Sequence, residues 1–388
     1  MSEAYIVAAM RTPGAKRNGR LSGWHPADLG GFIIDALLAK TGTDPALIED
    51  VIFGCVQQVG QQSQNVARTA VLSSCLPEAV PGVTIDRQCG SSQQAIHFAA
   101  QAVISGAMDV VIAGGVESMS RVPMFTASTL AEKNGMGHYR GARFEQRYGS
   151  VEPSQFTGAE MMATKYQLSR EQLDHFALES HRKAADAEEA FHGEIVPVPI
   201  VLPDGTEAMH GTDEGVRAGA TIEGIQQVKL LVDGGVITAA NASQICDGAS
   251  SMLVVNERGL KRLGVEPIAR VHSMHVQGSD PVIVLETPIP ATLNALKKAG
   301  MKIDDIDLFE VNEAFASVPL AWLKETGASP DCLNVNGGAI ALGHPLGASG
   351  TRIAATLLNA LGKRGKRYGL QTMCEGGGLA NVTIFERL

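Results

Sequence analysis

Aromatic residues and charge are both scarce in this sequence. Phe, Trp and Tyr make up 5% of the 388 residues, charged residues make up 19%, and the net charge is −9. A chain with this excess of acid lacks the basic surface that binding to nucleic acid requires. The sequence also has no apolar run that approaches the ~20 residues of a membrane-spanning helix. We therefore expect neither nucleic acid nor a membrane as a partner.

Cysteine is sparse, and its spacing argues against the common cysteine-based scaffolds. The six cysteines include no C-x-x-C pair and no zinc-finger spacing, so they indicate a reducing compartment and no metal site. The first residues, MSEAYIV, contain an acid and no basic residue, which does not fit a signal peptide. We expect the protein in the cytoplasm.

Glycine, by contrast, is abundant, with 43 residues in the chain. This favours tight α/β packing with many special backbone turns. Residues 36–54 and 295–309 both have the pattern of a helix, a glycine, a short acidic turn and a strand, and residues 96–115 and 353–378 form a second matching pair. Such a repeat predicts two duplicated α/β domains, with the chemistry where they meet.

Residues from about 118 to 245 fit neither half. They are rich in methionine, glycine and charge, and their spacing predicts one clear helix over 169–190 with acidic residues in its first turn. Insertions of this size commonly carry ligand contacts over a rigid scaffold. A surface elaboration or an oligomerisation arm explains the same composition equally well.

Cys89, in the run DRQCGSS at residues 86–92, is the most informative single residue. Apolar residues recur at helical spacing from Ile96 to Ile104, so Cys89 lies at the head of a predicted helix that Gly106 can end. The positive end of a helix lowers the pKa of a thiol and makes it a better nucleophile. Taken alone, a cysteine at a helix start is more often a small buried hydrophobe.

Three segments near the C-terminus supply groups that match a nucleophilic thiol. They are NEAF at 312–315, GGAIALGHPLGASG at 337–350 and CEGGG at 374–378. A thiolate together with His344 and the second cysteine, Cys374, indicates acyl transfer through a covalent thioester. Each element alone has a plain alternative, since His344 can be structural, Asn312 a helix cap and the glycines a hairpin turn.

In this order, the segments resemble the thiolase family, and the resemblance covers the whole chain. It implies an α/β protein with a duplicated fold, in which two βαβαβαββ halves pack as α-β-α-β-α layers and a loop domain is inserted. The implied division is an N-terminal half of residues 1–117 with 246–267, a loop domain of 118–245 for CoA binding and oligomer contacts, and a C-terminal half of 268–388. A homodimer or a dimer of dimers is the implied assembly.

The resemblance also implies a role for each catalytic group. Cys89 holds the acyl group, His344 activates its thiol as a base, and Cys374 exchanges the proton at Cα of the acetyl group, which needs a thiolate poised near neutrality. His344 and Asn312, the latter through a held water, form one oxyanion hole. The backbone N–H groups of Cys89 and Gly376 form the other.

Coenzyme A is the implied ligand, as a substrate and not as a permanently bound cofactor. Ser243 matches a serine that contacts the pantetheine arm in the family, and a turn serine is the alternative. The remaining candidate CoA contacts are Ala314, Phe315, Gln155, Arg217 and Lys229. The last two are candidates for the phosphates or the adenine, and a solvated surface charge is their alternative.

Two positions depart from family members that make acetoacetyl-CoA. Those members carry His-Met where this chain has Ser154-Gln155, and a second pocket methionine is replaced near Val284. Because methionine fills irregular gaps, both changes predict a roomier acyl pocket. The QCGSS and MCEGGG runs are similar to those of degradative thiolases, including some that act on steroid side chains. We therefore expect CoA-dependent cleavage of a 3-ketoacyl-CoA into acetyl-CoA and a shortened acyl-CoA.

Three other functions remain as alternatives. A biosynthetic acetyl-CoA C-acetyltransferase would run the same chemistry toward acetoacetyl-CoA. A ketoacyl synthase is disfavoured because Asn312 and Cys374 stand where its two histidines would be. An inactive thiolase-like lipid-binding protein is disfavoured by the intact catalytic residues. His97 and His175 lie in predicted helices, and we interpret them as structural.

Overall fold

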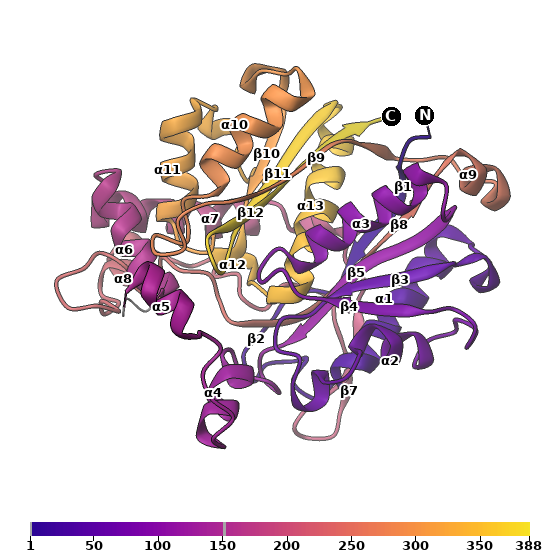
Figure 1. Cartoon of the computed structure of the whole chain (residues 1–388), viewed down its shortest axis with the longest axis horizontal. Helices are drawn as coiled ribbons and strands as arrows, with labels where there is room; N and C mark the ends of the chain where they lie inside the picture. The colour runs from indigo at the N-terminus through magenta and orange to yellow at the C-terminus, as the bar shows by residue number, and fades with distance from the viewer. Residues whose placement is uncertain (1, 150–152) are drawn as a thin grey trace.

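The computed structural model describes residues 2–149 and 153–388 and shows two α/β halves with an insertion (Figure 1). The N-terminal half contains β1 (Tyr5–Arg11), β2 (Ala15–Lys16), α1 (Pro26–Thr41), β3 (Asp50–Gly54), α2 (Val66–Leu72), β4 (Gly82–Ile85), α3 (Ser91–Ser105), β5 (Val110–Ser118) and, after the insertion, β8 (Cys246–Val255). After α9 (Glu257–Leu263), the C-terminal half contains β9 (Ala269–Gly278), α10 (Pro288–Ala299), β10 (Leu308–Val311), α11 (Ser317–Thr326), α12 (Ala339–Leu342), α13 (Ser349–Arg364), β11 (Tyr368–Glu375) and β12 (Leu379–Arg387).

The strands of the two halves have the same order and the same directions. In the first half the order is β1-β8-β5-β3-β4, with β8 antiparallel to both neighbours and the last three strands parallel. In the second half the order is β9-β12-β11-β10, with β12 antiparallel to both neighbours. Beyond β10, where the first half has β4, the second half has only a parallel bridge from Phe309 to Leu333. This equivalence confirms the predicted duplicated fold.

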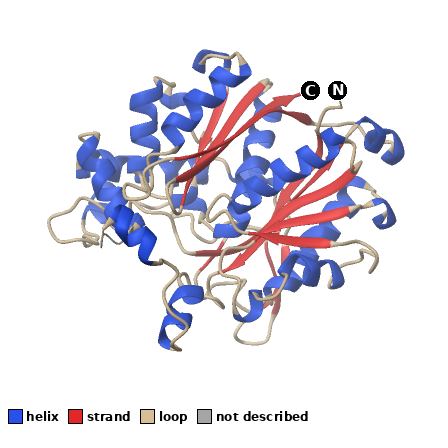
Figure 2. Ribbon diagram, viewed as in Figure 1, coloured by secondary structure: helices blue, strands red, loops and turns tan. Residues whose placement is uncertain are grey.

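Helices cover the two halves in layers (Figure 2). Side chains of α1 and α2 form one core with the N-terminal strands, and side chains of α10 and α11 form another with the C-terminal strands. Between them, α3 and α13 pack against strands of both halves. These cores give the predicted α-β-α-β-α layers. The two sheets also join through a short pairing of β1 with β9, at Tyr5–Arg270 and Ile6–Ala269.

The insertion divides its contacts between the two halves. It contains α4 (Thr126–Lys133), α5 (Ala142–Tyr148), α6 (Gln155–Lys165), α7 (Arg170–Asp186), β6 (Val198–Val201), β7 (Glu207–His210) and α8 (Ile222–Gln226). The β6–β7 hairpin joins the N-terminal core, whereas α6 and α7 join the C-terminal core. The helix predicted over 169–190 begins as expected, with a capping box at Ser169, but ends at Asp186 because a 3-10 turn follows.

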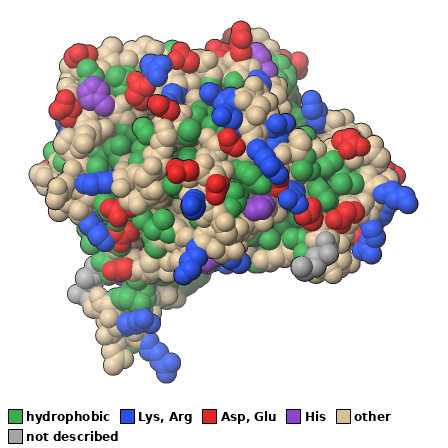
Figure 3. Space-filling view, turned by 90° about the horizontal axis from the view of Figure 1, so that it is seen from above, with side chains coloured by type: hydrophobic (Ala, Val, Ile, Leu, Met, Phe, Trp, Pro, Cys, Tyr) green, Lys and Arg blue, Asp and Glu red, His purple; other side chains and the backbone are tan. Residues whose placement is uncertain are grey.

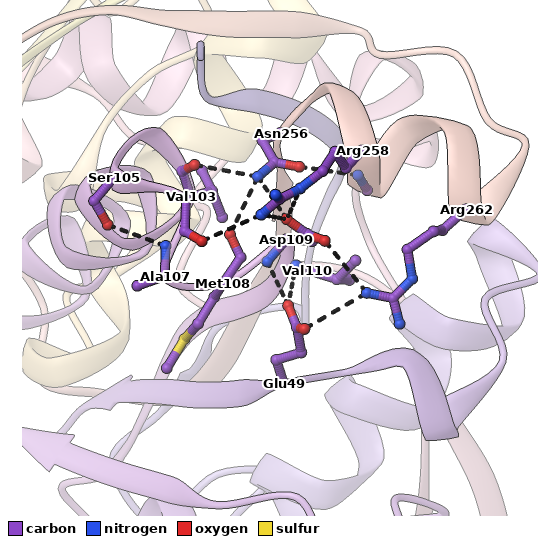
Figure 4. A network of polar contacts seen from close by, with 12 residues as sticks. Glu49, Val103, Ser105, Ala107, Met108, Asp109, Val110, Asn256, Arg258 and Arg262 are labelled. Carbon is purple, nitrogen blue, oxygen red and sulfur yellow. Dashed lines mark hydrogen bonds and ion pairs between the residues drawn. The ribbon is translucent and has the colours of Figure 1, made fainter. Parts of the chain in front are cut away.

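A polar network fixes the C-terminal end of α3 to the sheet (Figure 4). Asp109, beside the start of β5, accepts hydrogen bonds from Asn256 Nδ2 at 2.8 Å and from Arg258 Nε at 2.9 Å. Asn256 Nδ2 also lies 3.2 Å from the carbonyl oxygen of Val103, in the last turn of α3. This network holds one end of the helix in place, and Cys89 lies just beyond the other end.

Acidic and basic side chains are interspersed on the face seen in Figure 3. Together with the net charge of −9, this face does not resemble the basic surface that nucleic-acid binding requires. Within residues 2–149 and 153–388, every helix is too short or too polar to cross a membrane.

Candidate active site

Cys89 lies in a tight turn between β4 and α3. Gln88, which precedes it, has a φ of 50°, a left-handed conformation that is uncommon for a residue other than glycine. Ser91 holds this turn: its hydroxyl oxygen accepts a hydrogen bond from the Arg87 N–H at 2.9 Å and donates one to the Gln88 carbonyl at 2.6 Å. The turn places the partly exposed Cys89 just before Gly90, the N-cap of α3.

The pKa of this thiol is raised, so the predicted net lowering at the helix start is wrong. Burial is the main cause that raises the pKa of Cys89, to about 12, and the carboxyl group of Glu375 adds to it. A helix N-terminus stabilises an anion by roughly 0.3–1 kcal/mol at exposed sites, which is too little to offset desolvation and a neighbouring acid. The thiol is therefore protonated at neutral pH and needs a base.

His344, the predicted base, is held in one tautomer. Its Nδ1 lies 2.6 Å from Ser349 Oγ, and the Ser349 hydroxyl donates its own proton to the Pro345 carbonyl at 2.9 Å. With its proton used at Pro345, Ser349 accepts from the imidazole, so we assign the ring proton to Nδ1 and the lone pair to Nε2. Burial and the charge of Arg352 lower the pKa of His344 to about 3, so the imidazole is neutral in the resting site.

Asn312 lies beside that lone pair, at the end of β10. Its Nδ2 is 3.4 Å from Nε2 of His344, and its backbone N–H donates to the Thr372 carbonyl at 3.0 Å. Within residues 2–149 and 153–388, its buried Oδ1 has no hydrogen-bond partner. A buried amide oxygen without a partner is costly unless water satisfies it, so the site suits the held water that the resemblance implies.

The second thiol, Cys374, is the residue before the last in β11, next to the hairpin that leads into β12. It is buried, and burial followed by the neighbouring Cys89 raises its pKa well above the ordinary value. The expectation of a thiolate poised near neutrality is therefore wrong for this resting site. The charge of a Cys89 thiolate would act on Cys374, since it is among the causes that raise this pKa.

Gly376 follows in the same hairpin and lies against the Cys89 turn. A Cβ atom at this position would lie 2.9 Å from Gln88 Oε1, so the hairpin lies directly against the Gln88 side chain. In the part of the chain that the structure describes, neither the Cys89 nor the Gly376 backbone N–H makes a hydrogen bond of normal geometry to another residue. Two unused donors at one place are what an oxyanion hole requires.

The central helices bring the base to the nucleophile. Gly350, the second residue of α13, packs so closely on α3 that a Cβ atom there would lie 2.0 Å from the backbone nitrogen of Gln93. Cys89 precedes one of these two helices and His344 precedes the other. Leu346, from the segment after His344, belongs to the same apolar cluster as Cys89.

Four of the predicted CoA contacts lie beside this centre. The Ser243 N–H donates to the Ala314 carbonyl at 2.9 Å, and Ala242 forms a β-bridge with Phe315. Phe315 meets Phe156 edge to face, with ring centroids 5.7 Å apart. Gln155, next to Phe156, places its Nε2 3.5 Å from the sulfur of Met124, which packs against the cluster of Cys89.

Arg217 and Lys229 lie on the insertion, before and after α8. Both are exposed, and within residues 2–149 and 153–388 neither side chain makes a hydrogen bond or an ion pair. The Arg217 backbone N–H donates to Nδ1 of His181 at 3.2 Å, on α7. Their interpretation as phosphate or adenine contacts stays a prediction.

Sequence reasoning missed three residues that position the catalytic groups. They are Ser349, Gln244, whose backbone carbonyl accepts from His344 N–H at 3.0 Å, and Glu313. Glu313 is buried and accepts hydrogen bonds from Ser180 Oγ at 2.6 Å and from the Ile340 N–H at 3.1 Å, so it ties the NEAF segment to the segment that carries His344. Glu313 and Ser349 both lie inside the recognised motifs, and that position is the feature of the sequence from which their roles could have been predicted.

Val284 is strained at the position where the sequence predicts a replaced pocket methionine. Its φ is 57°, and the Leu285 N–H lies 2.6 Å from the Ile283 carbonyl across it. A β-branched residue in the left-handed region is a genuine outlier, and such strain gathers at functional sites.

Comparisons with known proteins agree with this site. The chain matches the thiolase N-terminal domain over residues 4–258 and the thiolase C-terminal domain over 265–387. The chain belongs to the thiolase family, and it is an acyltransferase. Among the described residues, no group of three or more His, Cys, Asp or Glu side chains is placed to hold a metal ion.

Its relatives include degradative enzymes of the family. It is 50% identical to the steroid 3-ketoacyl-CoA thiolase of Mycobacterium tuberculosis, over all of this chain and 95% of that one. It is 41% identical to the 3-ketoacyl-CoA thiolase of Aliivibrio salmonicida, over the full length of both. The crystal structure of human mitochondrial 3-ketoacyl-CoA thiolase matches with a TM-score of 0.89 at 34% identity, covering 100% of this chain and 99% of that one. These relatives confirm the prediction of the degradative thiolase type.

Proposed function

We propose that the protein cleaves a 3-ketoacyl-CoA with CoA, through an acyl group carried on Cys89. The observation that carries this proposal is the neutral, Nδ1-protonated His344, which the packing of α13 on α3 brings toward Cys89. Two protonated thiols and two unused backbone donors accompany it. A neutral thiol next to a neutral imidazole with a free lone pair is the starting state for general-base activation of a nucleophile.

Each step then has a group in place. The Cys89 sulfur attacks the 3-keto carbon while Nε2 of His344 takes the thiol proton. The bond between C2 and C3 breaks, Cys374 donates its proton to C2, and acetyl-CoA leaves. The CoA thiol next gives its proton to the Cys374 thiolate and attacks the acyl carbon on Cys89. As the shortened acyl-CoA leaves, the Cys89 sulfur takes back the proton that His344 holds. The N–H groups of Cys89 and Gly376, and His344 with Asn312, stabilise the charge on the two thioester oxygens in turn.

The covalent step gives the direct test. After brief incubation with acetyl-CoA, mass spectrometry should find an acetyl group on the peptide that contains Cys89. The Cys89→Ser variant is the control, and an adduct that forms there at the wild-type rate on another residue contradicts the proposal. Cys374→Ser should still acquire the acetyl group but lose thiolysis by several orders of magnitude, whereas His344→Ala should lose both. Equal loss of acylation in the two variants would refute the division of roles.

For the acyl group we propose a medium, branched or ring-bearing chain. Gln155 and Val284 stand where acetoacetyl-specific members carry methionine, and the strained backbone at Val284 supports a specialised pocket wall. A relative whose name specifies a steroid substrate is 50% identical. The biosynthetic direction remains the second candidate, because the chemistry is reversible.

We further propose that the protein is a cytoplasmic homodimer or dimer of dimers. We also propose that the chain divides into an N-terminal half of residues 1–117 with 246–267, a loop domain of 118–245 and a C-terminal half of 268–388. All six cysteines are unpaired, which suits a reducing compartment. β4 is the last strand of the sheet, so one edge of this strand has no neighbouring strand within the described chain. Such an edge is a suitable place for a second copy of the protein to bind. Ser243, beside Ala314 and Phe315, supports CoA binding by residues 118–245.

A further inference from the structure

The residue after Cys374 is a glutamate with an unusual environment. Glu375 is fully buried, and within residues 2–149 and 153–388 neither of its carboxyl oxygens has a hydrogen-bond partner. A buried carboxylate without partners is expensive, and a structure keeps one only at a considerable cost in stability. No step proposed above uses it.

Strand geometry directs this carboxyl group toward the nucleophile. Side chains alternate along β11, so Leu370 and Cys374 join the outer core while Gln371 reaches Gly350 of the central helix α13, with its Nε2 2.7 Å from that carbonyl oxygen. Glu375 therefore faces the central helices. A Cβ atom on Gly90 would lie 1.9 Å from Glu375 Oε1, so the carboxyl group lies directly against the residue that follows Cys89.

Glu375 is the strongest of the charged influences on Cys89. Asp86, in the same turn, and Glu117, on β5, contribute less. Asp86 accepts the Gln88 N–H at 2.6 Å, and Glu117 accepts N–H groups of Val56 at 2.8 Å and Gly347 at 2.9 Å. These bonds favour the anionic form of each acid, although burial still raises the pKa of both. Glu375 has only a weaker influence of this kind, from the backbone of Asn381.

We propose that Glu375 is a positioning residue that acts through Cys89: as a carboxylate it keeps the nucleophilic thiol protonated, and as a carboxylic acid it releases the thiol for activation by His344. A negative charge beside the sulfur opposes a second one, and the opposition ends when the carboxyl group takes a proton from solvent. Acylation therefore proceeds from the form of the enzyme in which Glu375 is neutral.

The titration range follows from the surroundings of Glu375. Burial raises the pKa of Glu375 to about 8, while the charge of Arg87 and, to a smaller extent, the backbone of Asn381 lower it. The acid form thus predominates below about pH 8 and the carboxylate above it. Cys374, on the opposite face of β11, also has its pKa raised by Glu375.

Alkylation of Cys89 by iodoacetamide tests this proposal, because the reagent reports on the thiolate and does not need acyl transfer. The rate constant is measured from pH 6 to pH 10 by mass spectrometry of the Cys89 peptide, in the wild type and in Glu375→Gln. We expect the alkylation rate constant of the variant, divided by that of the wild type, to lie near one at pH 6. Above pH 9 this ratio should rise to about ten, the change that one unit in the pKa of Cys89 produces. Asp247→Asn, at a buried carboxyl group that is not among the main influences on Cys89, is the matched control and should give a flat ratio.

If the ratio of the alkylation rate constants for Glu375→Gln is the same at every pH, the proposal is overturned. A purely structural role of Glu375 would change the reactivity of Cys89 equally at every pH, whereas the proposed role follows the titration of the carboxyl group. Arg87→Gln gives a second test if the first variant fails to fold. Without that positive charge Glu375 should keep its proton to higher pH, so the inflection of the wild-type profile near pH 8 should move upward; no movement, or a downward one, also overturns the proposal. The inference rests on Cys89 as the nucleophile, but failure of that function would show as a missing acetyl adduct, which is a separate measurement.

Discussion

The hydroxyl of Ser349 lies 2.6 Å from Nδ1 of His344 and donates its own proton to the Pro345 carbonyl. This arrangement decides which imidazole nitrogen can act as the base. Ser349, the first residue of α13, takes no part in the proposed bond-making steps, yet it selects the tautomer of His344 that can act as a base.

Replacing Ser349 with alanine should slow acylation of Cys89 by about 10- to 100-fold. The hydrogen bond stabilises the imidazolium that forms when His344 takes the thiol proton, and a bond to a charged group contributes ~1.5–3 kcal/mol. The measurement is the pre-steady-state release of CoA from acetyl-CoA. Ser250→Ala is the control, because Ser250 is equally buried and donates to the Ala348 carbonyl at 2.7 Å without touching His344. Equal slowing in both variants would show that the effect is general loosening of the helix start.

Glycine 350 should tolerate no side chain. Its Cβ would lie 2.0 Å from the Gln93 backbone, so Gly350→Ala must separate α13 from α3, at an expected cost of ~1–3 kcal/mol or more in the free energy of unfolding. Gly362 lies in the same helix, and a Cβ there would meet nothing within 4 Å. Gly362→Ala should therefore be neutral or stabilising by up to ~1 kcal/mol. Denaturant unfolding of the two variants checks this, and a similar loss in both contradicts the packing argument.

The acyl pocket should become selective for short chains when methionine is introduced. Gln155→Met or Val284→Met should raise kcat/KM for acetoacetyl-CoA relative to a ring-bearing 3-ketoacyl-CoA by tenfold or more, since each lost methylene contact is worth ~0.8 kcal/mol. Thr157→Met, at an exposed position of α6, is the control. A wild type that turns over acetoacetyl-CoA best and rejects longer substrates would favour the biosynthetic alternative.

His97 should make the protein less stable in acid. Burial lowers its pKa to about 3, and its Nε2 lies 2.8 Å from Thr383 Oγ1. Below its ordinary pKa the unfolded state takes up a proton that the folded state refuses, so this contribution to stability is lost as the pH falls from ~6.5 toward 3. His97→Gln should flatten the pH dependence of the unfolding free energy over this window by up to ~1.4 kcal/mol per pH unit. His175→Gln, on the exposed face of α7, should leave the slope unchanged, and parallel slopes in all three proteins would refute the assignment.

The duplicated fold and the residues of the site could be predicted because their signals are local. Cys89, His344 and Cys374 each lie in a run of unusual residues, and the repeat of helix and strand is visible along the chain. The protonation state of the thiols could not be predicted, because burial and Glu375 outweigh the helix start and both depend on packing between the halves. The same holds for the tautomer of His344, which depends on the carbonyl of Pro345 as well as on Ser349. The end of α7 was missed by four residues because a 3-10 turn continues its helical pattern.

The site draws on both halves of the duplicated fold, and this has a consequence during synthesis on the ribosome. The turn that holds Cys89 emerges with the first half, whereas His344, Cys374 and Glu375 belong to the last strands and helices to be made. At ordinary rates of translation the interval is roughly a quarter of a minute to a minute. The unfinished chain therefore carries its nucleophile without a base or a second thiol, and it cannot consume acyl-CoA until the final hairpin has folded.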